Sequence, residues 1–474
     1  MSYQRQAARE SCQTEAGASP ARICVRFVGG TLEISGLANK KPFPPGCRWD
    51  PRAGCFRAPA SAYSPILETL SHHGDRLIDS AYDGADLATP LCVKRPPRPF
   101  QTEALQAWQA NGGRGVVALP TGAGKSYLAL LAIDHTRRHT LVVAPTLDLV
   151  TQWYDLLRSS FRCPVGVIGG GEYDPQPLTV TTYDSASIHM NNLGNRFGMV
   201  VFDECHHLPS DTYALAAQCC LAPFRLGLSA TFERADGRHA LLQQLVGPLA
   251  YRCDIDALAG RYLAPFVIEQ IFVSLSDEEQ RRYDEARAVY LTFLAQQGIR
   301  MSTRDGFSQF VMRSSLSATG RRAMRAYQLQ RELAFSAPSK LHHVAHLLRK
   351  HKTDRTLLFT ETNNTALALS RHFLLPVITH QTHVRERSAI LHDFAHGTYN
   401  ALVSSKVLNE GVDIPEANIG IVISGSGSKL EYKQRLGRIL RKMDDKRAVL
   451  YELVTRNTSE MNTSTRRRDP HAHG

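Results

Sequence analysis

The sequence lacks the features that mark secreted, membrane-bound and zinc-binding proteins. Its ten cysteines lie between Cys12 and Cys253, contain no Cys-x-x-Cys pair and show no zinc-binding spacing. No uninterrupted apolar run is long enough to span a bilayer, and the opening residues contain no apolar stretch typical of signal peptides. We therefore expect a cytoplasmic protein with reduced cysteines, which binds neither zinc nor a membrane.

The chain is long and apolar enough to form several domains. Its 474 residues include 43% hydrophobic residues, an ordinary fraction for a globular protein, and the length suggests about three domains. Lys and Arg number 56 against 44 Asp and Glu, which gives a formal charge of +12. This surplus favours polyanionic partners, because neutralising phosphates releases condensed counterions. An ordinary basic surface would give the same total, so the charge alone decides little.

The N-terminal part of the chain has the pattern of a small α+β unit. Residues 1–20 are polar and without a period, which is typical of a disordered tail. The segment ICVRFVGGTLEISGL alternates apolar and polar residues around Gly29-Gly30, which predicts a β-hairpin. A turn-rich stretch and a helix over Ala60–Leu70 complete a unit that we place at residues 21–92. The basic, proline-rich segment Lys94–Pro99 is a linker.

Beyond the linker, short apolar runs alternate with helical stretches. A first series of runs lies at Gly115–Leu119, Thr140–Pro145, Val165–Gly169, Leu178–Thr182, Met199–Phe202 and Arg225–Ala230. A second series lies at Thr356–Thr360, Pro376–His380, Ala401–Ser405, Ile419–Ser424 and Ala448–Val454. Strands that alternate with helices imply parallel sheets covered on both faces. We therefore predict an α/β fold with two parallel-sheet domains, at residues 93–252 and 253–474.

Three further segments have weaker patterns. Residues 276–336 are rich in Arg, Gln and Ala with helical spacing and predict a helical insertion in the second domain. The end of the chain, RRRDPHAHG, which begins at Arg466, predicts a disordered basic tail. Trp49, Phe56 and Tyr63 could stack on nucleic-acid bases, but such residues in a small domain more often form its core, and we expect core.

The segment LPTGAGKS, residues 119–126, lies between a predicted strand and a predicted helix. Backbone N–H groups of such a loop bind phosphate oxygens, helped by the positive end of the following helix. Lys125 is expected to reach the β- and γ-phosphates, and Ser126 to hold Mg²⁺. The other loop residues expected at the phosphates are Pro120, Thr121, Gly122, Ala123 and Gly124. A glycine-rich turn without a ligand is the alternative, which the strand–loop–helix context disfavours.

An acidic pair follows a later strand, in the segment MVVFDECHH. Asp203 and Glu204 stand at the carboxyl end of this strand, where ligands bind in open α/β sheets. Asp203 is suited to the Mg²⁺ shell and Glu204 to polarising the attacking water. Because the pair follows the phosphate loop, it predicts hydrolysis of a nucleoside triphosphate. The adjacent His206 and His207 cannot easily face one ion, so we expect a hydrogen-bonding role for them.

Together these motifs resemble those of superfamily 2 helicases. The loop is similar to motif I, with Leu119 in place of the usual Gly, a variant common in helicases, and the letters DECH are similar to motif II of the DEAH type. Ser229 and Thr231 in the segment LSAT match motif III, which in the family couples hydrolysis to movement. Arg98 and Gln101 in the segment RPFQ match the element that recognises adenine.

Other segments match helicase motifs that bind nucleic acid or close the nucleotide site. The segments APTLDLVTQW and TTY resemble motif Ia and its neighbour, which face the nucleic-acid backbone in the family; the matching residues are Pro145, Thr146, Thr181 and Thr182. The segment NEGVDIP resembles motif V, with Asn409 expected at nucleic acid and Gly411 and Asp413 at the nucleotide.

The segment QRLGRILR resembles motif VI. Its spacing puts Gln434, Arg438 and Arg441 near one helical face, at i, i+4 and i+7. In the family, such arginines approach the γ-phosphate and stabilise the charge of the transition state. By itself the pattern would be read as a solvated basic helix face. Its pairing with motifs I and II favours the catalytic interpretation.

Finer features are similar to the XPB family of DNA repair helicases, of the bacterial and archaeal type. The segment LSATFERADGR contains Arg234-Ala235-Asp236 where XPB-like proteins carry Arg-Glu-Asp, so Arg234 and Asp236 are expected to couple hydrolysis to DNA. Ala235 departs from the pattern, which puts strand separation by this element in doubt. The segment GTLEISG with Trp49 and Phe56 is similar to the family's damage-recognition domain, and the insertion falls where archaeal relatives have a thumb-like module.

The resemblance covers about residues 22–456 and implies two RecA-like domains that use ATP and Mg²⁺ to move 3′ to 5′ on DNA. It also implies a nuclease partner in repair, which the residues themselves do not identify. Arginines of the insertion could grip DNA phosphates or form a solvated face: Arg313, Arg321, Arg322, Arg325 and Arg331.

Four alternatives stay open at this stage. Ala235 keeps open a double-strand DNA translocase that does not unwind. The motor of a restriction system is another, although no nuclease-like carboxylate–lysine constellation is evident in the sequence. The intact Lys125, Glu204, Arg438 and Arg441 argue against a DNA-binding scaffold without activity. An RNA helicase is disfavoured by DECH in place of DEAD and by the N-terminal unit.

Overall fold

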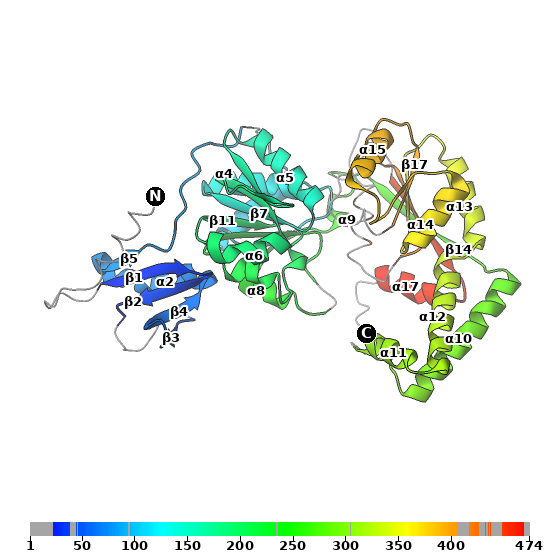
Figure 1. Cartoon of the computed structure of the whole chain (residues 1–474). Coiled ribbons are helices and arrows are strands. Elements are labelled where there is room, and N and C mark those ends of the chain that lie inside the picture. Colours follow the sequence, from blue (N-terminus) through cyan, green and yellow to red (C-terminus); the bar gives the residue numbers. More distant parts are fainter. Residues whose placement is uncertain are drawn as a thin grey trace. The chain divides into compact units, whose positions relative to one another are not determined.

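The computed structural model of the chain contains three β-sheets (Figure 1). The residues it describes are 22–37, 44, 46–92, 95–233, 236–262, 264–303, 305–405, 417–425, 432, 435, 437 and 448–468. They fall into two compact units. The first holds most residues up to 250, and the second runs from Tyr251 onward and also takes in the short segments 117–128 and 228–233. None of the helices in the described part of the chain is long and apolar enough to cross a membrane.

The N-terminal sheet has five strands in the order β3-β4-β2-β1-β5. Its elements are β1 (Ile23–Val28), β2 (Thr31–Ser35), β3 (Arg48–Asp50), β4 (Cys55–Pro59), α2 (Tyr63–Leu70) and β5 (Leu77–Asp79). Strands β1 and β2 form the predicted hairpin around Gly29 and Gly30, whose positive φ angles of 56° and 81° suit a tight hairpin turn. The fully buried Leu32, Ile34 and Ile66 join the sheet to α2, which confirms the predicted α+β unit.

Two of the three aromatic residues expected in the core of this unit are buried there. Phe56 and Tyr63 are only 4% and 8% exposed. Trp49 is 55% exposed, and its ring packs edge-on against Phe56 at 5.1 Å between centroids. The expectation of core was therefore wrong for Trp49, because β3 is the edge strand of the sheet and carries this side chain on its exposed side.

The second sheet has eight strands in the order β13-β6-β12-β11-β7-β10-β8-β9. Its strands are β6 (Arg114–Ala118), β7 (Thr140–Ala144), β8 (Val165–Gly169), β9 (Glu172–Tyr173), β10 (Leu178–Thr182), β11 (Met199–Phe202), β12 (Phe224–Ser229) and β13 (Leu249–Arg252). The helices are α3 (Pro99–Ala110), α4 (Lys125–Thr136), α5 (Leu147–Ser160), α6 (Tyr183–Leu193), α7 (Ala214–Gln218), α8 (Ala240–Leu245) and α9 (Ile255–Leu258). All six predicted strands are present, and the short β9 and β13 escaped prediction.

Parallel pairing decides where the loops of this sheet lie. Strand β11 pairs in parallel with β12 and β7, and β10 pairs in parallel with β7 and β8. Helices α5 and α6 lie on opposite faces of the sheet (Figure 1). Because β7, β8, β10, β11 and β12 run in the same direction, whereas the short β9 is antiparallel to β8, the loops after these five strands share one edge.

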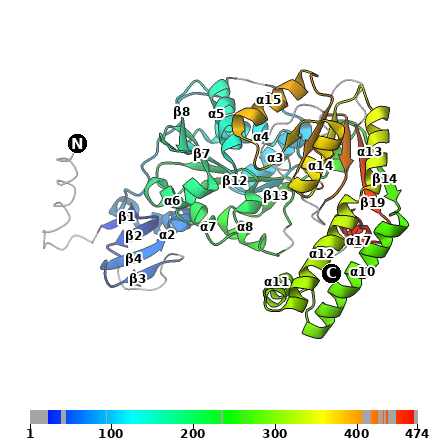
Figure 2. The ribbon, with the colours of Figure 1, turned by 45° about the vertical axis from the view of Figure 1, so that its right-hand side comes forward.

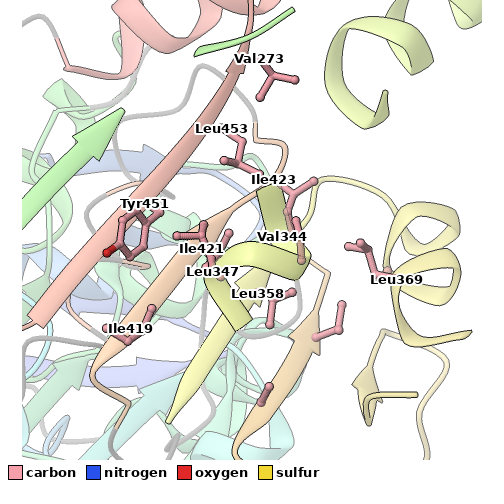
Figure 3. Packing of buried hydrophobic residues seen from close by; sticks show 13 residues of the cluster. Val273, Val344, Leu347, Leu358, Leu369, Ile419, Ile421, Ile423, Tyr451 and Leu453 are labelled. Carbon is pink, nitrogen blue, oxygen red and sulfur yellow. The ribbon is translucent and has the colours of Figure 1, made fainter. Parts of the chain in front are cut away.

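The third sheet has six strands in the order β14-β19-β18-β15-β17-β16. They are β14 (Phe266–Val273), β15 (Thr356–Phe359), β16 (Val377–Ile378), β17 (Ala401–Ser404), β18 (Ile419–Val422) and β19 (Ala448–Thr455), and every neighbouring pair is parallel. The helices are α13 (Ser339–Lys350), α14 (Asn363–Phe373), α15 (Val384–Ala395) and α17 (Ser459–Arg468). Val344 and Leu347 of α13 and Leu369 of α14 pack on one face (Figure 3). The predicted α/β fold with two parallel sheets is confirmed.

The insertion predicted at residues 276–336 is helical, as expected. It consists of α10 (Asp277–Gln297), α11 (Gly306–Ser315) and α12 (Ala318–Ser336), and α10 and α12 lie side by side (Figure 2). Ser276 and Glu279 form a reciprocal capping box that starts α10. The insertion has its own core, in which the Tyr290 and Phe293 rings contact Phe310.

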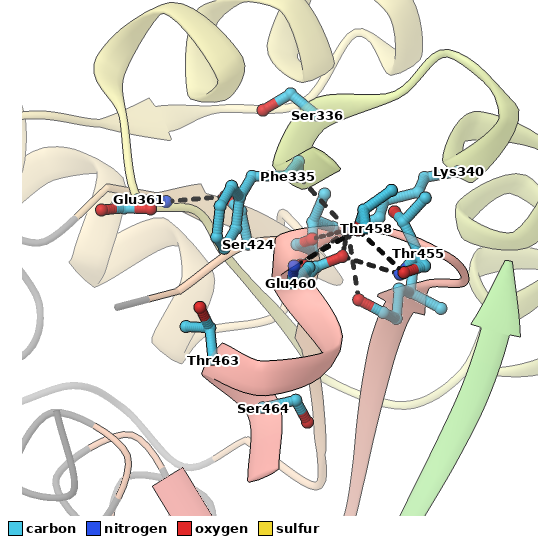
Figure 4. Close-up of polar contacts among 12 residues, drawn as sticks. Phe335, Ser336, Lys340, Glu361, Ser424, Thr455, Thr458, Glu460, Thr463 and Ser464 are labelled. Carbon is cyan, nitrogen blue, oxygen red and sulfur yellow. Dashed lines mark hydrogen bonds and ion pairs between the residues drawn. The ribbon is translucent and has the colours of Figure 1, made fainter. Parts of the chain in front are cut away.

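A buried lysine bonds the end of the insertion to the third sheet. The Lys340 ammonium donates to Glu460 Oε2 at 2.7 Å, and both side chains are 1% exposed. It also donates to the carbonyl oxygen of Phe335 near the end of α12 (Figure 4). The carbonyl oxygens of Ile423, directly after β18, and of Leu453, near the end of β19, accept from it as well. One ammonium group therefore supplies donors to carbonyl oxygens of three elements and to the carboxylate in the first turn of α17.

The C-terminal basic run differs from its prediction. Residues 466–468 form the last turn of α17 and are not a disordered tail. Glu460 anchors the first turn of this helix, since its carboxylate also accepts from the Thr455 N–H at 2.7 Å. Residues 469–474, like residues 1–20, lie outside the described residues.

Replacement of the buried cation should strongly destabilise the second unit. We expect Lys340→Met to lower the free energy of unfolding by about 3–5 kcal/mol, because Glu460 stays buried without its charge partner. The Lys340→Met/Glu460→Gln double variant should recover part of the loss. The midpoint of urea denaturation followed by circular dichroism measures both. Arg281→Ala, which removes exposed ion pairs in α10, is the control and should leave the midpoint almost unchanged.

The loss in free energy of unfolding caused by Lys340→Met should depend on pH. Burial raises the pKa of Glu460, and Lys340 opposes this rise. Without Lys340 the folded-state pKa lies further above the unfolded value, so the stability linked to protonation is present at low pH and lost as pH rises through the folded pKa. The deficit should therefore be smaller at pH 5 than at pH 8. An equal deficit at both values would contradict the role of Glu460.

Candidate functional site

The phosphate loop lies between β6 and α4. Gly122 and Gly124 have φ angles of 83° and 87°, a region where side chains other than glycine are strained. The Leu119 N–H donates to the Ser229 carbonyl at 3.0 Å, which ties the start of the loop to the end of β12. Helix α4 begins at Lys125, so its first N–H groups and its positive end face the loop. This backbone fits a bound triphosphate.

Asp203 follows β11 and is held from several sides. It is 7% exposed, and its N–H donates to the Val143 carbonyl at 2.9 Å. Its carboxylate Oδ1 accepts from the Glu204 N–H at 3.0 Å, and Oδ2 accepts from the Trp153 indole N–H at 2.8 Å. Its carbonyl accepts from the Tyr183 hydroxyl at 2.9 Å. The structure therefore fixes the carboxylate that the sequence predicts for a metal.

Glu204 and the two histidines form a compact group beside it. Glu204 has a φ of 46°, a strained value for a non-glycine residue that often marks functional sites. His206 Nδ1 lies 3.4 Å from Glu204 Oε2, and the His206 and His207 rings are 4.3 Å apart. The hydrogen-bonding role expected for the histidine pair stays a prediction.

Motif III lies at the end of β12, between the strand that leads into the phosphate loop and the strand that leads into Asp203. Ser229 is fully buried, and its hydroxyl accepts from the Thr231 N–H at 3.2 Å. Since the Ser229 carbonyl also accepts from the loop, this turn contacts the phosphate loop directly. Its place in the sheet suits the coupling role that the resemblance implies.

The segment matched to adenine recognition starts α3. Gln101 is 4% exposed, and its side-chain oxygen accepts from the Arg98 N–H at 3.0 Å. The two residues form a capping box, so the same bond that begins the helix also fixes the Gln101 amide. Contact of Arg98 and Gln101 with a base stays a prediction.

The motifs matched to nucleic-acid binding lie at the adjoining part of the same edge. Thr146 Oγ1 accepts from the Leu149 N–H and caps α5, and Thr182 Oγ1 accepts from the Ser185 N–H and caps α6. Because β7 and β10 are neighbouring parallel strands, both helix N-termini lie at one edge, where they favour phosphate. Pro145 precedes the first cap.

Thr181 and Thr182, the second predicted pair, make different contacts. Thr182 is the cap residue of α6, whereas Thr181 is buried and its hydroxyl donates to the Ile168 carbonyl at 2.7 Å. Thr181 thereby joins β10 to β8 and supports the position of its neighbour.

Three consecutive glycines at the end of β8 were missed by the sequence analysis. Gly169, Gly170 and Gly171 have φ angles of 137°, 63° and 94°. A Cβ on Gly169 would come within 2.9 Å of Ser185 Oγ, and one on Gly170 within 3.3 Å of Leu147. The glycines therefore let the β8–β9 turn lie close against the first turns of α5 and α6. The signal was the Gly-Gly-Gly run directly after a predicted strand.

Several predicted site residues cannot be placed. Those outside the described residues are Arg234, Asn409, Gly411, Asp413, Gln434, Arg438 and Arg441. Asp236 is described, and its carboxylate accepts from the Arg238 N–H at 3.1 Å. Arg435, which the sequence analysis did not single out, is 2% exposed and donates to the Ser424 carbonyl at 3.2 Å. Its guanidinium lies 5.6 Å from the Phe359 ring, so this side chain packs on the third sheet.

The second unit has a cavity of 890 Å³ at the carboxyl ends of β15 and β18. Helices α12, α13 and α14 line it, and Arg331 forms an ion pair with Glu361 at 2.8 Å on its wall. Of the five insertion arginines considered for phosphate binding, Arg331 is therefore engaged with a carboxylate of the sheet.

Three family models match parts of the chain. A model described as "Xeroderma pigmentosum group B helicase damage recognition domain" matches residues 25–81. One described as "Type III restriction enzyme, res subunit" matches residues 94–234, and one described as "ERCC3/RAD25/XPB C-terminal helicase" matches residues 321–470.

Curated relatives match over most of the chain. A protein of Sulfurisphaera tokodaii named "DNA 3'-5' translocase XPB2" is 39% identical over 92% of this chain and 99% of its own length. Proteins named "DNA 3'-5' helicase XPB" from Kineococcus radiotolerans and Mycobacterium tuberculosis are 31% and 29% identical over 78% and 76% of this chain. The chain spans only 62% and 61% of these two longer proteins.

A solved structure supports the fold. The helicase domain of Hef from Pyrococcus furiosus covers 78% of this chain and 98% of its own length, with a TM-score of 0.55 and 17% identity. At this identity the likeness shows the fold alone.

Substitution in the phosphate loop should weaken nucleotide binding without unfolding the chain. We expect Gly124→Ala to lower the affinity for ATP about tenfold, because a side chain at positive φ costs about 1–2 kcal/mol and the loop relaxes away from its phosphate-binding shape. Titration with a fluorescent ATP analogue measures the change. Gly112→Ala is the matched control, because Gly112 has a φ of 67° in the turn before β6, at the opposite end of that strand from the loop. Equal losses in both variants would contradict the assignment.

Proposed function

Because the chain belongs to the XPB family of superfamily 2 helicases, we propose that it is an ATP-dependent motor that moves 3′ to 5′ on DNA and acts in DNA repair. One observation carries the proposal. The phosphate loop, Asp203 and the capped N-termini of α5 and α6 follow strands of a single sheet, so nucleotide and nucleic-acid elements share one continuous framework.

The residues that the first parallel-sheet domain contributes to the proposed nucleotide site have separate tasks. Bound ATP·Mg²⁺ supplies the phosphoryl group and the metal charge that neutralises its oxygens. Lys125 and the loop N–H groups hold the phosphates, and Ser126 and Asp203 hold the metal. Glu204 orients the attacking water, and Gln101 with Arg98 recognises the base. The tight backbone of the loop and the fixed Asp203 carboxylate support these roles.

Residues outside the described part complete the proposal from the family pattern. Gln434, Arg438 and Arg441 are proposed to stabilise transition-state charge, with Gly411 and Asp413 at the nucleotide. Asn409, Arg234 and Asp236 are proposed to couple hydrolysis to DNA. The Arg435 side chain, which is buried and bonded to the Ser424 carbonyl after β18, supports this proposal.

DNA is proposed to be held by its backbone. Helix N-termini and the glycine turn offer N–H groups to phosphates and carry no base code, so little sequence specificity and a strong salt dependence are expected. The motor is proposed to work in the cytoplasm, where a nuclease would act on the DNA that it opens. Among the described cysteines, Cys24, Cys92 and Cys163 form no disulfide, which suits a reducing compartment.

Two observations favour second candidates. Ala235 favours a double-strand DNA translocase that does not unwind, and the match of residues 94–234 to a restriction-enzyme subunit favours a restriction motor. Two matches favour the repair motor over the restriction motor. Residues 25–81 match a damage-recognition domain, and the Sulfurisphaera tokodaii relative matches over 99% of its own length.

Removal of the phosphate-binding lysine should abolish ATP hydrolysis. We expect Lys125→Ala to lose DNA-stimulated phosphate release completely, because the charge at the β- and γ-phosphates is lost. Release is measured with single-stranded DNA, duplex, forked DNA and RNA across a salt series. Lys350→Ala, in α13 of the third sheet, is the control and should keep the activity. Survival of DNA-stimulated hydrolysis in Lys125→Ala would remove the proposal.

Paired displacement assays separate helicase from translocase. Strand displacement from a forked duplex reports unwinding, whereas triplex displacement reports movement on duplex DNA. With Ala235 in place, we expect triplex displacement to exceed strand displacement, and Ala235→Glu to raise strand displacement. Unwinding equal to triplex displacement in the unaltered chain would show that Ala235 does not limit strand separation.

A further inference from the structure

Two buried aromatic side chains donate hydrogen bonds to Asp203, one to its carboxylate and one to its backbone carbonyl. Trp153 in α5 donates its indole N–H to Asp203 Oδ2 at 2.8 Å, and Tyr183, the first residue of α6, donates its hydroxyl to the Asp203 carbonyl at 2.9 Å. The two side chains are 2% and 1% exposed. Because water cannot reach these positions, loss of either donor leaves an acceptor that solvent does not satisfy.

Both donors belong to the helices whose N-termini are proposed to hold DNA phosphates. Tyr183 directly follows the capping residue Thr182. Trp153 lies six residues after the start of α5, about 9 Å along the helix. A helix moves as a rigid rod over this length, so a shift of its N-terminal turn carries the indole with it.

Asp203 is fixed on its other side by the sheet. Its N–H donates to the Val143 carbonyl in β7, and Oδ1 accepts from the Glu204 N–H. The backbone therefore follows β11, while the orientation of Oδ2 follows α5. Hydrogen bonds weaken steeply as their angle departs from linearity, so a small movement of α5 relative to β11 changes the hold on the carboxylate.

We propose that Trp153 and Tyr183 are positioning residues that couple DNA binding at α5 and α6 to the orientation of Asp203. Phosphate contact at the two helix N-termini settles α5 and α6 on the sheet. The Trp153 bond then orients the carboxylate for the metal, and the Tyr183 bond holds the Asp203 peptide group that carries it. The role rests on the function proposed above, because it needs ATP hydrolysis that DNA stimulates.

A purely structural role makes a different prediction. The Tyr183 ring also packs against Tyr213 and Phe202, with centroids 5.4 and 6.4 Å away. If packing were the whole role, removal of the polar atoms would lower stability alone. Coupling requires changes in DNA stimulation and in the response to Mg²⁺.

The test compares Trp153→Phe and Tyr183→Phe in the full chain. Steady-state ATP hydrolysis is measured with and without duplex DNA, across a Mg²⁺ titration. We expect Trp153→Phe to reduce the stimulation factor, the ratio of kcat with DNA to kcat without it, on the order of tenfold, as for loss of a hydrogen bond to a charged group. The half-saturating Mg²⁺ concentration should rise several-fold. Tyr183→Phe, which loses a bond to a neutral carbonyl, should show the same changes at about half the size on a logarithmic scale.

Trp108→Phe is the matched control. Trp108 is 1% exposed in the same unit, and its indole N–H donates to the Arg225 carbonyl at 2.9 Å. This variant loses a buried indole donor, so its melting temperature should fall by about as much as that of Trp153→Phe. Its stimulation factor and its response to Mg²⁺ should be unchanged. Tyr213→Phe, which loses an exposed bond to Asp184, is the control for Tyr183→Phe.

The outcomes are distinct. A wild-type stimulation factor and Mg²⁺ response in folded Trp153→Phe, or equal losses in Trp153→Phe and Trp108→Phe, would overturn the coupling role. If Trp153→Phe does not fold, Tyr183→Phe decides, since it removes a single oxygen atom. If DNA fails to stimulate the unaltered chain, the proposed function itself fails, whatever the variants do.

Discussion

The parallel register of β11, β7 and β10 is the constraint on which the rest of the site depends. It places the residues after all three strands at one edge, so Asp203, Thr146 and Thr182 become neighbours although they are far apart in the sequence. Each strand is fully buried on both faces, and a slip of one residue would move every side chain to the opposite face and disrupt its close packing with the covering helices. The site is therefore held by the same burial that holds the sheet.

Glycine and capping residues then set the shape of that edge. Gly122 and Gly124 turn the phosphate loop toward α4, and the run Gly169–Gly171 brings a turn against the starts of α5 and α6. The edge thus offers helix N-termini at two places, one suited to a triphosphate and one to a nucleic-acid backbone. Asp203 follows β11, which lies between these two places in the sheet, and its carboxylate accepts a hydrogen bond from Trp153 of α5.

The second unit adds a buried ion pair to its own parallel sheet. Lys340 binds carbonyl groups at the ends of α12, β18 and β19, and Glu460 balances its charge. The thumb-like insertion is thereby fastened to the strands that flank the motif VI segment. A hydrophobic side chain at this position would leave these carbonyl groups without a donor, which explains a lysine in a core.

The sequence by itself determined most strands of the two parallel sheets, the glycine loop and the acidic pair, because apolar runs, glycine spacing and motifs are local patterns. Tertiary structure alone decided the exposure of Trp49, the presence of β14 and the bonds that Trp153 and Lys340 make. Trp153 and Asp203 are 50 residues apart, and Lys340 and Glu460 are 120 apart. Partners at such separations meet only through the folding of whole sheets, and no local pattern specifies which side chain will face which.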